Sequence, residues 1–241
     1  LNNLQDQLDE LLNKIESYID QDKKLTKNIF QELKKILVKW IDIDNKNFPL
    51  IQEYINGPGY GFFALYQNGK CKRYFMHKRL RENPPSGGSS CCAISVKLDD
   101  LMFQGKKILD YLNWHGVAMV EFKRNKIDNS LYLIEINSKF WGSLDLALRC
   151  GVNFPHLNAK VAINEKIDFS DEYDIGLKFH WPLDGEIKHL IKKPNSFFQI
   201  LSDLINPKVK SNIFFTDPFP ALHSLYSSIR NFYSYIVNGK F

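Results

Sequence analysis

The segment GVAMVEFKRNKIDNSLYLIEIN, residues 116–137, decides the predicted fold. Its two ends, residues 117–123 and 131–137, alternate apolar and other side chains with the period of two that is typical of β-strands. The polar residues between them form a natural turn. The segment therefore predicts a pair of neighbouring strands, each with a glutamate near its C-terminal end.

The acidic side chains of this pair are the sharpest chemical signal in the sequence. Alternation places Glu121 on one face of the first strand, and Leu133, Glu135 and Asn137 on one face of the second. With the turn centred near Ile127, the two glutamates become near-diagonal neighbours. Two carboxylates on an apolar sheet face repel each other unless a cation lies between them, and Mg²⁺ prefers such oxygen ligands. Two exposed glutamates paired with surface lysines remain the alternative interpretation.

The rest of the chain surrounds this hairpin with further helices and strands. Two amphipathic helices are expected over residues 1–41, because their apolar residues keep helical spacing. The turn at Asn68-Gly69 predicts a second hairpin. The remaining expected elements are strands over 49–55 and 175–181, helices over 98–112 and 144–150, and a terminal helix over 221–237.

A row of basic side chains occupies the second strand of that hairpin. Alternation predicts that Arg73, Phe75, His77, Arg79 and Arg81 share one face. Guanidinium groups suit polyphosphate or carboxylate oxygens, since each can bind them through two hydrogen bonds. A solvated edge strand protected by charges is an equally simple interpretation, and a nucleic-acid-binding β-domain would depend on this row alone.

Composition excludes several classes of protein. The chain has 241 residues, 44% of them hydrophobic and 14% aromatic, which is enough for a substantial core and too much for a disordered chain. The net charge of +5 is too small to argue for nucleic acid. No apolar run reaches the ~20 residues that span a bilayer, and no signal-peptide pattern opens the chain. The four cysteines lack metal-ligand spacing, so reduced thiols in the cytoplasm are expected.

Four motifs together resemble the C-terminal half of an ATP-grasp enzyme: LIQEYINGPGYG (50–61), HKRLRENPPSGG (77–88), GVAMVEFKRN (116–125) and LYLIEINSKFWGSLDLALRCGVNFP (131–155). The similarity covers roughly residues 49–160 and is closest to predicted carboxylate–amine ligases that are similar to carbamoyl-phosphate synthetase large chains and biotin carboxylase. It implies an α+β fold, an ATP-grasp C-lobe with an antiparallel sheet flanked by helices and with most of the upstream lobe missing.

The resemblance also implies roles for individual residues. Glu121, Glu135 and Asn137 match the metal-binding set. Arg79 matches the basic residue that faces the phosphates, and Arg81 lies close by. Lys139 stands where many relatives carry an arginine, so it supplies charge without the two-pronged geometry.

The nucleotide contacts implied by the resemblance come from two places. Gln52, Glu53, Tyr54 and Ile55 match the segment between the two ATP-grasp lobes, whose side chain and backbone groups meet adenine. His77, on the face of Arg79, is the further candidate for nucleotide binding.

The implied activity is an ATP-dependent carboxylate–amine or carboxylate–thiol ligase that works through an acyl-phosphate with ATP and Mg²⁺ or Mn²⁺. Small-molecule carboxylates and amines are the expected partners, without nucleic acid or membrane, and a homodimer is a possible assembly. The chain alone is expected to be weak or inactive, because half of the sandwich around ATP is missing. The alternative is a non-catalytic nucleotide-binding or interaction module, an incomplete relative of the same fold.

Three divisions of the chain follow from this interpretation. Residues 1–48 are expected to be a helical remnant of the upstream lobe, and residues 49–170 the C-lobe with the metal and nucleotide site. Residues 171–241 are expected to be a C-terminal extension without recognisable chemistry.

Overall fold

The computed structural model describes residues 52–85, 87–213 and 216–238, and it divides the chain into two compact units, Leu1–Asn56 and Gly57–Phe241. The predicted helical segment 1–48 lies outside the described residues. Residues 52–56 form no strand, so the strand expected over 49–55 is not found in its described part. An apolar run becomes a strand only where a neighbour pairs with its backbone, and no strand of the described residues pairs with 52–56.

The second unit is built on a seven-stranded sheet with the order β5-β4-β1-β2-β3-β6-β7. Adjacent strands are antiparallel except β6 and β7, which are parallel. The α+β class is confirmed, and the expectation of an antiparallel sheet fails only for this last pair. The strands are β1 (Gly59–Gln67), β2 (Lys70–Asn83), β3 (Ser89–Ser95), β4 (Gly116–Arg124), β5 (Leu131–Asn137), β6 (Lys178–His180) and β7 (Lys210–Ser211).

The predicted hairpin turn joins β1 to β2. Asn68 and Gly69 both have positive φ angles, 51° and 71°. Two successive residues with positive φ match the right-handed twist of the flanking strands, which is why Asn-Gly is favoured there. This part of the prediction is confirmed.

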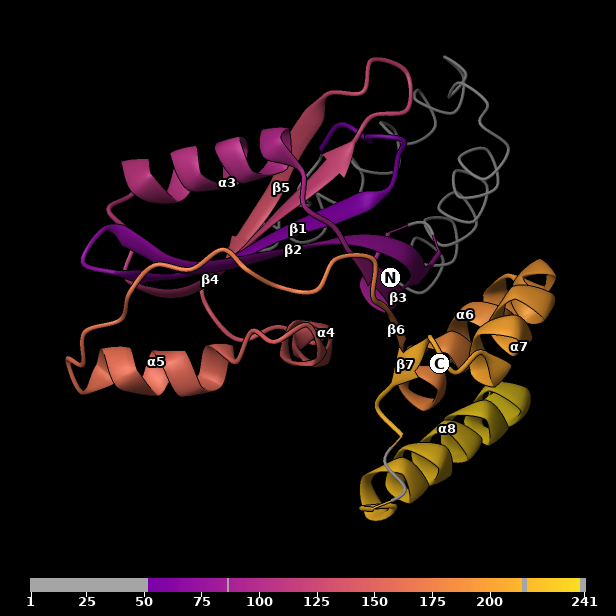
Figure 1. Cartoon of the computed structure of the whole chain (residues 1–241). Coiled ribbons are helices and arrows are strands. Elements are labelled where there is room, and N and C mark those ends of the chain that lie inside the picture. Colours follow the sequence, from indigo (N-terminus) through magenta and orange to yellow (C-terminus); the bar gives the residue numbers. More distant parts are fainter. Residues whose placement is uncertain (1–51, 86, 214–215, 239–241) are drawn as a thin grey trace, which may run out of the picture. The chain divides into compact units, whose positions relative to one another are not determined.

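Helices cover both faces of the sheet (Figure 1). Helix α3 (Asp99–Tyr111) lies on one face, and α4 (Leu144–Arg149) and α5 (Phe154–Ala162) lie on the other. Alternate residues of β1 divide between these layers: Phe62 joins the core cluster of α3, and Phe63 joins that of α4 and α5. The predicted helices over 98–112 and 144–150 are confirmed as α3 and α4.

The C-terminal segment continues the sheet. Strand β6 pairs with β3, with Cys92 opposite His180, and it is shorter than the strand expected over 175–181. The structure draws no boundary near residue 170. After β6 come the π-helical turn η1 (Pro182–Glu186), α6 (Ile187–Lys192), the 3₁₀ turn η2 (Pro194–Ser196), α7 (Phe197–Ile205) and α8 (Phe219–Asn238).

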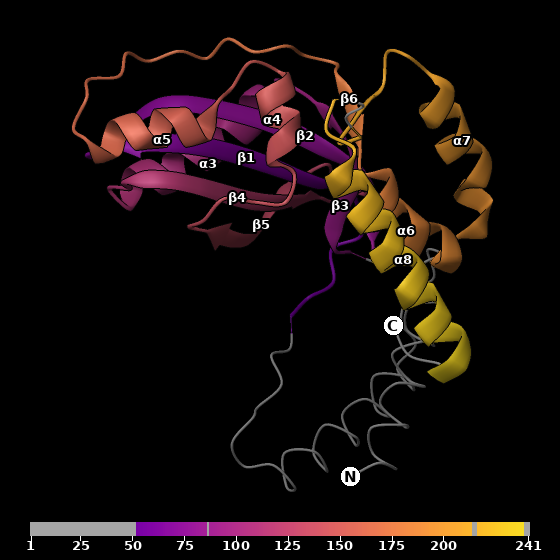
Figure 2. The same cartoon turned by 90° about the horizontal axis from the view of Figure 1, so that it is seen from below.

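These C-terminal helices gather at one end of the sheet, beside β6 (Figure 2). Helix α8 confirms the terminal helix expected over 221–237, and it contacts η1 through the Ser228 hydroxyl, which donates to the Leu183 carbonyl at 2.6 Å. Among the described residues, no helix combines the length and apolar character needed to cross a membrane. All four cysteines are free.

Candidate active site

The two glutamates of the hairpin face each other across β4 and β5. Glu121 pairs directly with Glu135, and Met119 pairs with Asn137, so the predicted near-diagonal arrangement is corrected to a direct one. The cause is a register shift after Glu121, where Phe122 pairs with Leu133 and leaves Ile134 as an extra residue. Such a β-bulge reverses the alternation. Leu133 therefore lies on the opposite face of the sheet from Glu135, although the alternation predicted that the two share a face.

Both glutamates line a cavity of about 460 Å³, here called the acid cavity. Its wall also contains Arg79, Asn137 and Lys139, so the structure brings together five of the predicted site residues. Glu121 has a side chain that is 14% exposed, and Glu135 is exposed. A partly buried hollow with carboxylate, amide and cationic groups in its wall is the kind of place where a charged ligand is held.

Arg79 links the acidic side chains of this region. Its Nη2 lies 2.7 Å from Glu121 Oε1, its Nη1 lies 3.4 Å from Glu82 Oε1, and Nη1 donates to the Gly88 carbonyl at 2.9 Å. Burial raises the pKa of the Glu82 carboxyl, an effect that Arg79 opposes. A second cavity of about 460 Å³ shares Arg79, Glu121 and Glu135 with the acid cavity and extends to Gly59 and Lys123. The side chains of Arg79, Glu121 and Glu135 thus border both cavities.

Arg81 does not line either cavity. Arg79 pairs with Ala93 and Arg81 pairs with Cys92, so a register shift at Leu80 turns the two arginines to opposite faces. The expectation that they share a face is therefore wrong, since a bulge reverses the alternation on which it depended.

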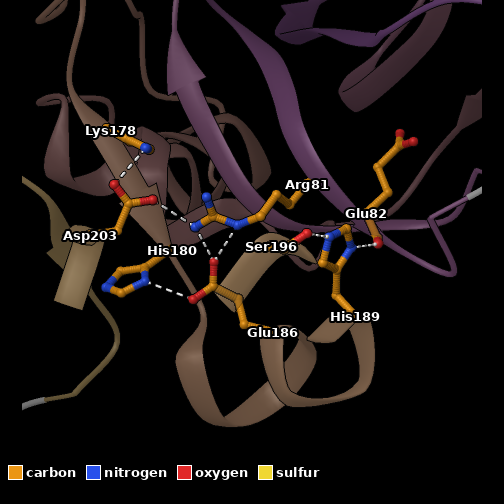
Figure 3. Close-up of polar contacts among 8 residues, drawn as sticks. All are labelled: Arg81, Glu82, Lys178, His180, Glu186, His189, Ser196 and Asp203. Carbon is orange, nitrogen blue, oxygen red and sulfur yellow. Dashed lines mark hydrogen bonds and ion pairs between the residues drawn. The ribbon is translucent and has the colours of Figure 1, made fainter. Parts of the chain in front are cut away.

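Arg81 instead belongs to a charge cluster of the buried residues Arg81, His180, Glu186 and Asp203 and the partly exposed Lys178, here called the buried charge cluster (Figure 3). Its guanidinium binds Glu186 through both Nε and Nη2, and Nη2 lies 2.8 Å from Asp203 Oδ2. Lys178 Nζ lies 2.6 Å from Asp203 Oδ1, and His180 Nδ1 lies 2.9 Å from Glu186 Oε2. Burial opposes ionisation of Asp203, yet hydrogen bonds from Lys178 and Arg81 hold its pKa below the usual range. The cluster joins β2 to the C-terminal segment.

The remaining arginine of the basic row is also engaged. Arg73 Nη2 donates to the Glu172 carbonyl at 2.5 Å. Each of the three arginines in this row therefore contacts other groups of the protein.

His77 is fully buried and lines neither cavity. Its ring packs against Phe63 at 4.6 Å between centroids, and neither ring nitrogen has a hydrogen-bond partner among the described residues. Burial, followed by the charge of Arg79, lowers its pKa well below the ordinary value. Its predicted role toward the nucleotide stays a prediction that this position does not favour.

Gln52, Glu53, Tyr54 and Ile55 belong to the first compact unit. Gln52 to Tyr54 are exposed and Ile55 is buried. Their predicted contacts with adenine stay predictions.

Several residues of the acid cavity were missed by the sequence reasoning. Trp141 and Asp145 follow the EIN motif, Glu135-Ile136-Asn137. The C-terminal segment adds Trp181, Gly185 and Asn212. Trp181 Nε1 donates to Asp145 Oδ2 at 3.2 Å, which joins the two segments at the cavity wall. Trp141 and Asp145 stand within the quoted motif 131–155, whereas Trp181, Gly185 and Asn212 carry no local pattern, because the pairing of β6 with β3 and of β7 with β6 brings their segment to the cavity.

The donor set suits a magnesium ion. Glu121 and Glu135 offer carboxylate oxygens and Asn137 an amide oxygen on one sheet face, which is the ligand chemistry that Mg²⁺ prefers. Among the described residues, no three side chains of His, Cys, Asp and Glu gather at metal-binding distance. A cation held here would therefore take its other ligands from Asn137, water and phosphate oxygens.

Comparison with solved structures shows an ATP-grasp-like fold. The biotin carboxylase domain of a thermophilic 2-oxoglutarate carboxylase, bound to bicarbonate, matches with a TM-score of 0.51 and 12% identity over 64% of this chain and 37% of that one. The biotin carboxylase–β,γ-ATP complex from Campylobacter jejuni gives a TM-score of 0.48 at 11% identity over 64% of this chain and 36% of that one.

A more distant match is the L-amino acid ligase from Bacillus licheniformis, with a TM-score of 0.38 and 19% identity over 47% of this chain and 31% of that one. The chain thus spans little more than a third of the length of the first structures that it matches. No protein-family model and no curated protein matches the sequence.

Proposed function

We propose that the acid cavity is the Mg²⁺–nucleotide site of an ATP-dependent ligase that joins a carboxylate to an amine, or to a thiol, through an acyl-phosphate. The observation that carries this proposal is the direct pairing of Glu121 with Glu135, on the face that also presents Asn137. The fold, which is ATP-grasp-like, agrees with it. The activity, the small-molecule substrates, a homodimeric state and a cytoplasmic location are proposed for the protein as a whole.

Each polar residue that was predicted for the acid cavity would have its own role. Glu121, Glu135 and Asn137 would hold the metal, which, when bound, offsets the charge of the phosphates. Arg79, which pairs with Glu121 at 2.7 Å, would hold phosphate oxygens that approach these carboxylates. Lys139, which is exposed at the cavity wall, would bind the substrate carboxylate as a point charge.

Nucleotide binding tests this proposal directly. Calorimetry with a non-hydrolysable ATP analogue and Mg²⁺ should show binding that chelation of the metal weakens. Glu135→Gln removes one carboxylate while keeping its size, and we expect it to lower the affinity roughly tenfold or more. Glu165→Gln is the matched control, because this exposed side chain pairs with Lys160 outside the cavity.

Equal affinities of the wild type and Glu135→Gln would remove the metal site. Phosphate release from ATP, screened against pools of carboxylates and amines, then separates the ligase from its alternative. Tight nucleotide binding without turnover under any pool would favour the non-catalytic nucleotide-binding module.

A further inference from the structure

Helix α7, at the β6 end of the sheet, turns its charged side inward and its apolar side outward (Figure 2). Asp203 is 6% exposed, and its carboxylate lies 2.8 Å from Arg81 Nη2 and 2.6 Å from Lys178 Nζ. Besides Asp203, only Ile200 is buried among the nine residues of this helix. Surface helices of globular proteins usually bury their apolar stripe and expose their charges, and α7 does the reverse.

The apolar residues of α7 form one continuous stripe. At about 3.6 residues per turn, six of its nine residues follow one another around the helix in the order Ile200, Leu204, Phe197, Leu201, Ile205 and Phe198. The stripe begins at the buried Ile200 and ends in solvent, where Ile205 and Phe198 are 76% and 79% exposed. Turning it toward the core would break the ion pairs of Asp203, which is costly for a buried charge.

An apolar groove of about 290 Å³ runs beside the stripe and widens it. Leu183 of η1 and Leu190 of α6 form one part of its wall, and Leu201 and Leu204 of α7 form another. A contiguous exposed apolar surface of this kind marks a place where a protein binds a partner.

The charges around α7 indicate which partner this is. Five lysines bracket the helix along the chain: Lys188, Lys192, Lys193, Lys208 and Lys210. None of them forms an ion pair with another described residue, and all except Lys188 are exposed. Asp203 is the only acid between residues 187 and 210, and Arg81 and Lys178 compensate it. The segment thus combines an apolar stripe with uncompensated positive charge.

We propose that α7 docks on the surface of an anionic lipid bilayer, with Phe198 and Ile205 at the boundary of the acyl chains and the five lysines near the headgroups. Helices that lie in this interface combine phenylalanine or leucine on one face with lysines at the headgroups, and each lysine contributes about 1 kcal/mol near an anionic membrane. A second copy of the chain fits less well, because a symmetric contact would bring the same lysines together.

Such peripheral attachment needs no membrane-spanning helix. It departs from the sequence-based expectation that no membrane is a partner. It is also independent of the proposed function, because Asp203 and the stripe lie outside the acid cavity.

Flotation of the full chain with lipid vesicles tests the proposal. The probes are phosphatidylcholine vesicles with about 30% phosphatidylserine and vesicles of phosphatidylcholine alone. We expect binding to the anionic vesicles to be roughly tenfold or more tighter, and to weaken as the salt concentration rises. Equal binding to both kinds of vesicle, or binding to neither, would overturn the proposal.

Phe198→Ser/Ile205→Ser is the decisive double variant, because both side chains are exposed and neither lines the groove. We expect it to lose roughly tenfold or more in affinity for the anionic vesicles, with an unchanged melting temperature. The matched control is Ile127→Ser/Ile163→Ser, at positions that are 91% and 73% exposed outside α7. Wild-type binding by the α7 variant, or an equal loss in the control, would show that α7 is not the docking surface.

The lysines provide a second test that leaves the apolar stripe intact. Lys192→Gln/Lys193→Gln should lower the affinity roughly tenfold, whereas Lys126→Gln/Lys166→Gln, at exposed positions elsewhere, should change it little. Equal effects of the two variants would mean that the net charge of the protein, and not the surface around α7, attracts the vesicles.

Hydrogen exchange tests the same surface without any substitution. On anionic vesicles the amides of α7 should exchange more slowly, while those of α5 should not change. Protection of α5 without protection of α7 would overturn the proposal. Light scattering covers the other occupant: a wild-type dimer that Phe198→Ser/Ile205→Ser converts to a monomer, without vesicle binding, would assign the stripe to a second copy of the chain.

Discussion

The side chain of Arg81 is only 3% exposed, and its partners come from segments more than a hundred residues further along the chain. Removing one partner of a buried ion pair leaves the other charge uncompensated, which typically costs about 3–5 kcal/mol. Arg81→Met would leave Glu186 and Asp203 with only His180 and Lys178. We expect its free energy of unfolding to fall by about that amount, measured by urea denaturation.

The matched control is Lys97→Met, which removes the exposed pair between Lys97 and Asp171, with side chains 36% and 41% exposed. Exposed pairs contribute about 0–1 kcal/mol, because water screens them. Similar losses in the two variants would show that the buried cluster does not hold the C-terminal segment in place.

His189 makes the stability depend on pH. Its Nδ1 lies 2.6 Å from the Glu82 carbonyl and its Nε2 lies 3.0 Å from the Ser196 hydroxyl, an arrangement that a neutral ring satisfies. Burial, the largest cause, lowers the pKa of His189. In the unfolded chain the ring takes up a proton near its ordinary pKa of about 6.5. The unfolded state then binds more protons, so the free energy of unfolding should fall as the pH drops below about 6.5.

Urea denaturation at several pH values between about 5 and 8 measures this effect. His189→Gln should be less stable than the wild type at neutral pH and should lose less stability on acidification. His156→Gln, at an exposed position, should leave the pH dependence unchanged. An identical pH profile for His189→Gln and the wild type would contradict the assignment.

At the residue scale, the sequence predicted the chemistry that depends on local alternation. Glu135 and Asn137 alternate along one strand, so their common face could be foreseen, whereas the direct pairing of Glu121 with Glu135 depends on the bulge in the pairing of β4 with β5. The opposite orientation of Arg81 could not be foreseen, since the bulge at Leu80 arises in the pairing with β3. That strand, Ser-Ser-Cys-Cys-Ala-Ile-Ser, carries no alternation that marks it.

At the scale of elements, α3 packs closely on the sheet because Gly105 stands at the contact. A Cβ added there would lie 2.4 Å from the Phe62 ring, which is fully buried. In an exposed helix, Gly→Ala stabilises by about 1 kcal/mol. Here the overlap should outweigh this gain, and overpacking typically costs about 1–3 kcal/mol. We expect Gly105→Ala to lower the free energy of unfolding.

A double-mutant cycle with Phe62→Leu tests the cause. The smaller side chain leaves room for the new methyl group, so Gly105→Ala should cost less in that background. If the two losses in free energy of unfolding were simply additive, overlap with the Phe62 ring would not be the cause of the destabilisation by Gly105→Ala. The sequence predicted α3 itself from its helical spacing, but the distance between helix and sheet is set by this long-range contact.

At the scale of the whole molecule, the C-terminal segment completes both the sheet and the acid cavity. The sequence showed an element near residues 175–181 but no chemistry beyond residue 170, because Trp181, Gly185 and Asn212 meet the EIN motif only in three dimensions. The cavity therefore draws on a longer part of the chain than the similarity to ATP-grasp motifs, which ends near residue 160.

Truncation can test this view of the molecule. A chain cut after Ser170 lacks β6, leaves β3 as an uncovered edge and deprives Arg81 of both carboxylates. An unpaired buried charge and an open edge both favour unfolding or aggregation. We expect this chain to lose cooperative unfolding and the near-ultraviolet circular dichroism of its packed aromatic rings.

The matched control is a chain cut after Ile213, which keeps Trp181, Gly185 and Asn212 and removes α8. Helix α8 holds η1 through the hydrogen bond from Ser228 to the Leu183 carbonyl, so its loss should lower the stability moderately and leave the cavity formed. The longer chain should therefore unfold cooperatively and still bind the nucleotide analogue. If the chain cut after Ser170 also unfolded cooperatively and bound the nucleotide analogue, the C-terminal segment would not be needed for either property. The buried charge cluster would then contribute little to the stability of the sheet.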